Sequence, residues 1–231
     1  MKATVYQKLL RHLALASISL SSGAGVASAA LGEIPVEVAG SLIDEIDEDD
    51  RTGWNIHDRI GALTLLTHDP RAVVRTRVAR SAHTLWDSAP DEALQLVRQL
   101  LRDPEPEVAL AAGTALEHLI DRASPARRIE IVCDLTVSTE ASDRIAIARA
   151  LSRPTPLFVT DIAITELSRD TNPEVRALAL SAAERHFREA PGAYRAIALV
   201  AAADSDASVR AAARRLLGSR RGDDAAGSGV T

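Results

Sequence analysis

Six histidines and one cysteine are the side chains of this 231-residue chain that most often serve as bases, nucleophiles or metal ligands. Cys133 lies in the apolar run IEIVCDL, so we expect a small buried core residue rather than a nucleophile. A single cysteine also excludes an internal disulfide and a cysteine-based zinc site. No histidine pair has the H-x-x-x-H spacing of a helical zinc site, and we expect structural or surface roles for His83, His118 and His186.

The motifs of common enzymes are missing as well. The sequence contains no G-x-S-x-G nucleophile elbow, no glycine-rich phosphate loop and no dinucleotide-binding fingerprint. The acidic run SLIDEIDEDDR lacks the glycine turn and the ligand spacing of a calcium-binding loop. The sequence therefore predicts no catalytic residue, no cofactor and no metal site, and a protein that is not an enzyme.

A stretch of acid, proline and alanine recurs along the chain instead. LLRDPEPEVALAAGTALEHL, which begins at Leu100, has counterparts around residues 69, 170 and 204. Successive aspartates are 34 residues apart in two intervals and 67 residues apart in the third, where VSTEASDRIAIARAL supplies a weaker copy with Ser138 in the Asp position. The repeat-turn residues are Asp69, Asp103, Asp170, Asp204, Arg75, Arg144, Arg176 and Arg210.

Prolines recur with the same period and indicate where helices begin. Pro90, Pro125, Pro156 and Pro191 are spaced by 35, 31 and 35 residues, and proline is favoured in the first turn of a helix. Each period thus predicts a first helix, a turn with Asp, and a second helix, which we call helix B. Apolar residues follow a period of 3.6, and only 3% of the residues are aromatic, which favours close-packed helices. The fold class is predicted to be all-α.

The pattern D-P-x-x-x-V-R-x-x-A-x-x-A-L resembles HEAT repeats, particularly the short bacterial kind also found in phycobilisome-lyase-like proteins. The resemblance covers about residues 55–219, with four good copies and one weak copy. It implies an α-solenoid of about five HEAT-like helix pairs over residues 54–219, in which each repeat must stack on its neighbours. Two departures, Ala109 in the Arg position and Ser138 in the Asp position, predict a break in any Asp/Arg ladder between them.

Physical chemistry assigns structural roles to the recurring pair. We expect the turn Asp to cap helix B through backbone N–H groups. The Arg that follows can reach an Asp of its own turn or of the neighbouring turn with its planar fork.

The two ends of the chain differ from the repeats. Residues 1–32 contain no acidic residue and hold both lysines, Lys2 and Lys8, before an apolar segment and Ala27-Ser28-Ala29. Residues 1–30 are therefore predicted to be a signal peptide for export to the periplasm or exterior, or else a first helix of a cytoplasmic protein. The apolar segment is too short for a permanent membrane span. Residues 31–53 are expected to form an acidic linker or helical cap, and residues 220–231 a flexible tail.

The function predicted is that of a monomeric, non-catalytic scaffold or adaptor that binds a protein partner on its helix-B face. The net charge of −5 argues against nucleic acid as the partner. Trp86, Arg77, Arg80 and Arg185 are candidate partner-binding residues, because Trp and Arg are common in binding hot spots. The alternative is an enzyme or enzyme accessory of the HEAT-like lyase or DNA-glycosylase type. The identity of the partner does not follow from the sequence.

Overall fold

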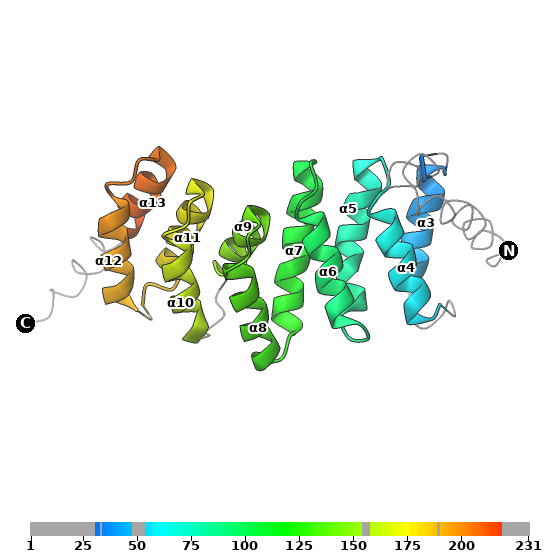
Figure 1. The fold of residues 1–231 in the computed structure, drawn as a ribbon, viewed down its shortest axis with the longest axis horizontal. Helices are drawn as coiled ribbons and strands as arrows, with labels where there is room; N and C mark the ends of the chain where they lie inside the picture. The colour runs from blue at the N-terminus through cyan, green and yellow to red at the C-terminus, as the bar shows by residue number, and fades with distance from the viewer. Residues whose placement is uncertain (1–30, 33, 48–53, 154–157, 189, 219–231) are drawn as a thin grey trace, which may run out of the picture. The chain divides into compact units, whose positions relative to one another are not determined.

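A computed structural model of the chain describes residues 31–32, 34–47, 54–153, 158–188 and 190–218. Over these residues the protein is helical and has no strand, which confirms the predicted all-α fold class (Figure 1). The predicted signal peptide and the predicted tail lie outside the described residues. The helices are α3 (Val36–Asp47), α4 (Ile56–Leu66), α5 (Ala72–Ser81), α6 (Pro90–Leu100), α7 (Pro106–Arg122), α8 (Pro125–Thr136), α9 (Ala141–Ala150), α10 (Phe158–Leu167), α11 (Pro173–Arg185), α12 (Pro191–Ala201) and α13 (Ala207–Gly218), with a 3-10 turn, η1 (Ala82–Leu85), after α5.

Proline and small polar residues set where these helices begin. Pro90, Pro125 and Pro191 open α6, α8 and α12, as the sequence predicts, while Pro156 lies outside the described residues. Because the first helical N–H has no partner within the helix, proline loses nothing there. Ser124 and Asn172 cap the helices that follow them by accepting hydrogen bonds from the backbone N–H groups of Arg127 and Glu174.

The chain divides into two compact units, Met1–Leu119 and Ile120–Thr231, with the boundary inside α7. In the first unit, α5 packs against α3, α4 and α6. In the second unit, α11 packs between α9 and α13, and α10 contacts α8 and α11 (Figure 1). The single array over residues 54–219 stays a prediction, and each unit is described by itself.

The acidic segment before the repeats forms a helix that belongs to the first unit. Residues 36–47 make up α3, whose apolar side buries Leu42, Ile43 and Ile46. Its carboxylates face α5 and the turn after it: Asp44 accepts a hydrogen bond from Arg77, and Asp47 accepts one from Ser81. The helical alternative predicted for this segment therefore applies to residues 36–47, and residues 48–53 lie outside the described residues.

Alanine dominates the core and lets the helix axes approach closely. Because its side chain is a single methyl group, alanine also loses no rotamer freedom on burial. The fully buried alanines, all with 0% exposure, are Ala79, Ala82, Ala93, Ala112, Ala148, Ala179, Ala182, Ala183, Ala198 and Ala213. None of the helices in the described part of the chain is long and apolar enough to cross a membrane.

Two helical glycines differ in what an added methyl group would meet. Gly113 lies in the middle of α7, where an added Cβ would meet nothing within 4 Å, so Gly113→Ala should stabilise the protein by about 0.5–1 kcal/mol. Gly40 of α3 faces Arg77, whose Nη1 would lie 2.0 Å from an added Cβ, so Gly40→Ala should displace the flexible end of Arg77 and stabilise the protein less than Gly113→Ala does. Urea unfolding of the two variants compares them, and destabilisation by Gly113→Ala would contradict the open space found beside it.

Candidate functional site

The recurring Asp and Arg side chains form bidentate pairs between successive repeats. Arg75 donates from Nε and Nη2 to the carboxylate of Asp103, at 2.7 and 2.9 Å. Arg144 makes the same two bonds to Asp170, at 2.5 and 3.1 Å, and Arg176 makes them to Asp204, at 2.8 Å each. We call these three pairs the Asp/Arg ladder. Each pair joins residues 26 or 28 positions apart, so it ties one helix pair to the next.

Each ladder arginine also holds its own turn. The Nη1 atom of Arg75 donates to the backbone carbonyl of Asp69, at 2.7 Å. Arg144 and Arg176 do the same to the carbonyls of Ser138 and Asp170, at 2.7 and 2.8 Å. Each ladder arginine therefore binds both the backbone carbonyl of its own turn and the carboxylate of the next turn. The sequence left open which of the two turns it would reach.

The turn aspartate stabilises the turn before helix B rather than the first turn of that helix. One oxygen of Asp103 accepts from the backbone N–H of Glu105, and Asp170 accepts likewise from Asn172. In the last copy Asp204 accepts from Asp206 N–H. The expectation that the Asp caps helix B directly is therefore corrected: the bond goes to the residue two positions on, which is the helix N-cap in the case of Asn172.

The ladder changes the ionisation of its members. Burial raises the pKa of Asp103 and of Asp170, but hydrogen bonds from their arginines and from backbone N–H groups outweigh burial and leave each pKa below its ordinary value. The hydrogen bond from Arg176 is the main cause of the lowered pKa of Asp204. The charged forms of all three carboxylates are therefore favoured in the folded protein.

These lowered pKa values predict a loss of stability in acid. Because each folded-state pKa lies below the unfolded value of about 3.9, the unfolded chain binds protons more readily. The stabilisation is complete above about pH 5 and is lost as the pH falls through the folded-state pKa values. We expect the urea midpoint to drop steadily between about pH 5 and pH 2, and to drop less in an Arg176→Ala variant, which has lost one pair. If the urea midpoints of the two proteins fell by the same amount over this pH range, the Arg176–Asp204 pair would not be a cause of the acid sensitivity.

The ladder is interrupted where the sequence departs from the repeat pattern. Ala109 takes the place of an arginine in α7 and cannot donate a hydrogen bond from its side chain. Ser138, in the Asp position, instead donates from Oγ to Asp143, at 2.8 Å, and accepts from the backbone N–H of Glu140, at 3.2 Å. The turn at Ser138 is thus closed by a serine and a buried aspartate of its own repeat.

The first turn has a partner that the sequence did not reveal. Asp69 accepts two hydrogen bonds from Arg71, at 2.8 Å from Nε and 2.7 Å from Nη2, and is only 1% exposed. Arg71 also donates to the carbonyls of Leu31 and Ile34 and so ties the start of the described chain to this turn. The only signal for this role is the sequence Asp-Pro-Arg itself, because Arg71 lies two residues after the Asp.

The four candidate partner-binding residues differ in exposure and in the helices that carry them. Trp86 is only 7% exposed, so it packs in the core of the first unit and offers no anchor for a partner, which corrects that prediction. Arg77 is half-buried and pairs with Asp44 at 2.6 Å. Arg80 is exposed on α5 of the first unit, and Arg185 is exposed on α11 of the second.

Cys133 and the histidines show no catalytic arrangement among the described residues. Cys133 is exposed on α8, so the expectation of a buried residue is wrong. His186 is buried and contacts the carbonyls of Leu151 and Arg153. His83 and His118 lie edge to face with ring centroids 5.9 Å apart. No group of three or more potential metal ligands is found in the part of the chain that the structure describes.

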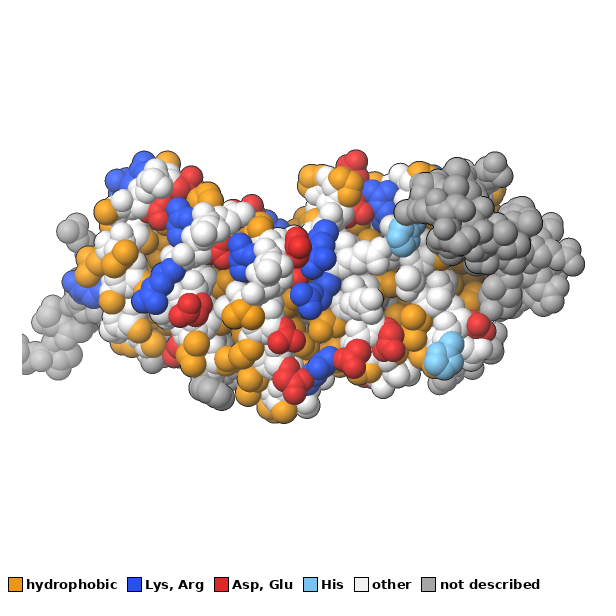
Figure 2. Space-filling model, viewed as in Figure 1, with side chains coloured by type: hydrophobic (Ala, Val, Ile, Leu, Met, Phe, Trp, Pro, Cys, Tyr) orange, Lys and Arg blue, Asp and Glu red, His pale blue; other side chains and the backbone are white. Residues whose placement is uncertain are grey.

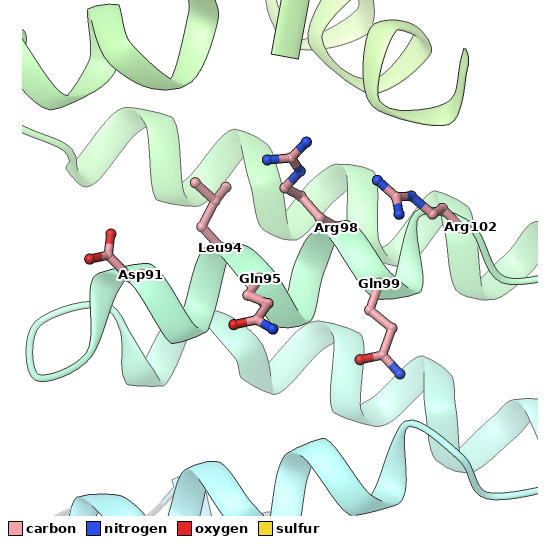
Figure 3. Close-up of a pocket in the computed structure, with 6 residues that line it drawn as sticks. All are labelled: Asp91, Leu94, Gln95, Arg98, Gln99 and Arg102. Carbon is pink, nitrogen blue, oxygen red and sulfur yellow. The ribbon is translucent and has the colours of Figure 1, made fainter. Parts of the chain in front are cut away.

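A depression of about 510 Å³ runs along α6 (Figure 3). The side chains that line it come from α6 and the turn after it, and they are Asp91, Leu94, Gln95, Arg98, Gln99 and Arg102. Gln99 is held by a hydrogen bond to Thr67, at 2.8 Å. These six side chains include no serine, cysteine or histidine nucleophile with an adjacent base, so we assign no reaction to this depression.

The chain was compared with known proteins. No protein-family model matches it, and no curated protein matches it. Among solved structures it is similar to an engineered protein whose crystal structure comes from the Northeast Structural Genomics Consortium, with 17% identity over 92% of this chain and 97% of that chain and a TM-score of 0.43.

Proposed function

We propose that the protein is a non-catalytic scaffold of the HEAT-repeat type that binds a protein partner on its helix-B face. The observation that carries the proposal is the Asp/Arg ladder. Its recurring charged side chains hold one helix pair to the next through bidentate bonds. The residues that recur therefore serve stacking, as expected for a repeat protein whose function lies in its extended surface.

The exposed side of helix B in the first unit is suited to a protein partner. On α5, Val73, Arg77 and Arg80 recur with helical spacing, and Val73 is 55% exposed. On α7, Leu110 is also exposed, at 57%. Large apolar side chains beside arginine are typical of protein–protein interfaces. The apolar side chains lose contact with water when a partner binds, and the arginine orients the partner through hydrogen bonds.

The mixed charge of the surface also favours a protein over a nucleic acid. Figure 2 shows acidic, basic and apolar side chains interspersed on the visible face of the described residues. A phosphate backbone would instead require a continuous basic surface. We further propose that the protein acts as a monomer. Residues 1–30 are proposed to be a signal peptide that directs export of the protein.

Affinity capture of the full chain from its own cells, with mass spectrometry of the captured proteins and of the bait, tests the proposal. A partner should be recovered by the native chain and lost by a Val73→Ser/Leu110→Ser variant. Val137→Ser is the control, because Val137 is also an exposed valine, at 79%, and lies at the C-cap of α8 rather than on this face. Equal recovery by all three proteins would exclude this face, and an intact Met1 in the mature bait would exclude cleavage of a signal peptide.

A further inference from the structure

Two imidazole rings meet near the ends of two successive helices B in the first unit. His83 lies in η1, directly after α5, and His118 lies in the last two turns of α7. Their ring centroids are 5.9 Å apart, and the ring planes are at 85° to each other. Because the two residues are 35 positions apart in the sequence, no local spacing motif indicates the pair. The packing of the helices brings the rings together.

The backbone fixes the tautomer of His83. Its Nδ1 lies 2.6 Å from the carbonyl oxygen of Arg80, and a carbonyl can only accept a hydrogen bond, so Nδ1 is the donor. In the neutral ring the proton is therefore on Nδ1, and Nε2 carries the unshared electron pair. Histidines that bind metal ions are oriented in the same way, by donating their second ring N–H to a carbonyl or a carboxylate.

His118 can serve as a second ligand from the facing helix. It is exposed on α7, so a rotation of its ring can direct a nitrogen toward the Nε2 side of His83 without opening the core. His83 is half-buried, and an ion can therefore reach the pair from solvent.

The separation of the rings suits one shared ion. A zinc–nitrogen bond is about 2.0–2.1 Å long, which puts each ring centre about 3 Å from the ion. Two imidazoles that bind one ion at a tetrahedral or wider angle then have centroids about 5–6 Å apart. The observed 5.9 Å lies in this range. Coordination restricts the angle between two ring planes only weakly, so the edge-to-face arrangement is compatible with it.

The ligand atoms select the class of ion. Imidazole nitrogen suits Zn²⁺, Cu²⁺ and Ni²⁺, whereas Mg²⁺ and Ca²⁺ are bound mainly by oxygen. Structural and catalytic zinc sites use three or four protein ligands, and no group of that size is found among the described residues. A pair of histidines therefore fits an exchangeable ion whose other coordination positions are filled by water.

We propose that His83 and His118 together bind a divalent transition-metal ion through Nε2 of His83 and one ring nitrogen of His118. The ion joins the end of α5 to α7, in addition to the Arg75–Asp103 pair that ties the same two repeats. The site does not depend on partner binding at Val73 and Leu110.

The test uses the full ¹⁵N-labelled chain, freed of metal with EDTA and titrated with Zn²⁺. The imidazole nitrogens are followed by NMR, and the two rings are identified by the loss of their signals in His83→Gln and His118→Gln. We expect Nε2 of His83 and one nitrogen of His118 to shift together and to saturate at one ion per pair.

Each single variant should weaken Zn²⁺ binding at the remaining ring by at least about tenfold, because the loss of even an outer-shell partner typically costs about 10–100-fold. His57→Gln is the matched control, because it removes an exposed histidine of α4 and should leave binding unchanged. Zn²⁺ should also raise the urea midpoint of the native chain but not that of His83→Gln or His118→Gln, since the pair exists only in the folded protein. The urea midpoints without Zn²⁺ verify that both variants fold.

Three results would overturn the proposal. The first is that the two rings show no saturable shift with Zn²⁺, in which case their contact is packing alone. The second is that either single variant binds Zn²⁺ as tightly as the native chain, which would mean that the rings do not share an ion. The third is that Mg²⁺ produces the same shifts at the same concentration, which would assign them to a general effect of charge.

Discussion

Replacing Arg75 by alanine should lower the free energy of unfolding by about 3 kcal/mol. The side chains of Arg75 and Asp103 are 10% and 6% exposed, so solvent screens their interaction weakly. Removing Arg75 leaves a nearly buried carboxylate with a single backbone N–H donor, from Glu105. It also removes the donor to the Asp69 carbonyl. Urea unfolding of the variant measures the loss.

Arg77 supplies the matched control for this prediction. It is also an arginine of α5 in an ion pair, but its side chain and that of Asp44 are 38% and 63% exposed. An exposed pair contributes about 0–1 kcal/mol, so Arg77→Ala should cost much less than Arg75→Ala. Equal losses for the two variants would contradict a structural role for the ladder.

A double-mutant cycle with Asp103→Ala separates the pair from its surroundings. Asp103→Ala alone should also be destabilising, because it leaves the Arg75 fork without its carboxylate. In the double variant neither charge is stranded, so the total loss should be smaller than the sum of the two single losses by about 1–3 kcal/mol. Strict additivity would show that the two side chains contribute separately, whatever their distance.

The repeat period located the ladder from the sequence because the ladder needs one charged pair in each repeat. A 34-residue step identifies Asp69, Asp103, Asp170 and Asp204 without any structure. It also identified Arg144 although its own turn has Ser138. What the period could not give is the direction of each bond, since a flexible arginine reaches its own turn and the next one equally well. The structure shows that each guanidinium binds the carbonyl of its own turn through Nη1 and the carboxylate of the next turn through Nε and Nη2.

The errors on Trp86 and Cys133 have different physical origins. α8 buries Ile131, Val132 and Leu135, and Cys133 falls outside that stripe, so strict helical periodicity would have placed it on the surface. The apolar run around it was misleading. Trp86 follows the 3-10 turn η1, which changes the angular phase of the helix, and nothing in the residue types around it marks that change.

The role of Arg71 and the partners of His186 could not be predicted, because their contacts are irregular. Arg71 replaces a ladder arginine by folding back onto Asp69 two residues away, which no repeat copy predicts. His186 lies at the C-cap of α11, and its contact with residues more than 30 positions away depends on how α9 and α11 pack. Single features of this kind carry no periodic signal.

His186 leads to the second large prediction. The imidazole is 2% exposed, and its Nε2 lies 2.9 Å from the carbonyl oxygen of Leu151 and 3.2 Å from that of Arg153. These carbonyls lie at the C-cap of α9 and two residues beyond it, where C=O groups have no partner within the helix. His186→Ala should cost about 3 kcal/mol, because it opens a cavity and removes the Nε2 donor from the buried carbonyl of Leu151. Thermal and urea unfolding measure the loss.

Two further variants separate the cavity from the hydrogen bonds. His186→Phe fills most of the volume but cannot donate to the carbonyls, so its cost of about 1–2 kcal/mol reports the lost bonds. His118→Ala is the control for removing a histidine near the end of a helix B, and it should change stability by less than about 0.5 kcal/mol because His118 is exposed. If His186→Phe were as stable as the native chain, the carbonyl contacts would contribute nothing, and His186 would act through its volume alone. The carbonyls at the end of α9 would then find their hydrogen bonds elsewhere, and the joint between α9 and α11 would rest on apolar packing.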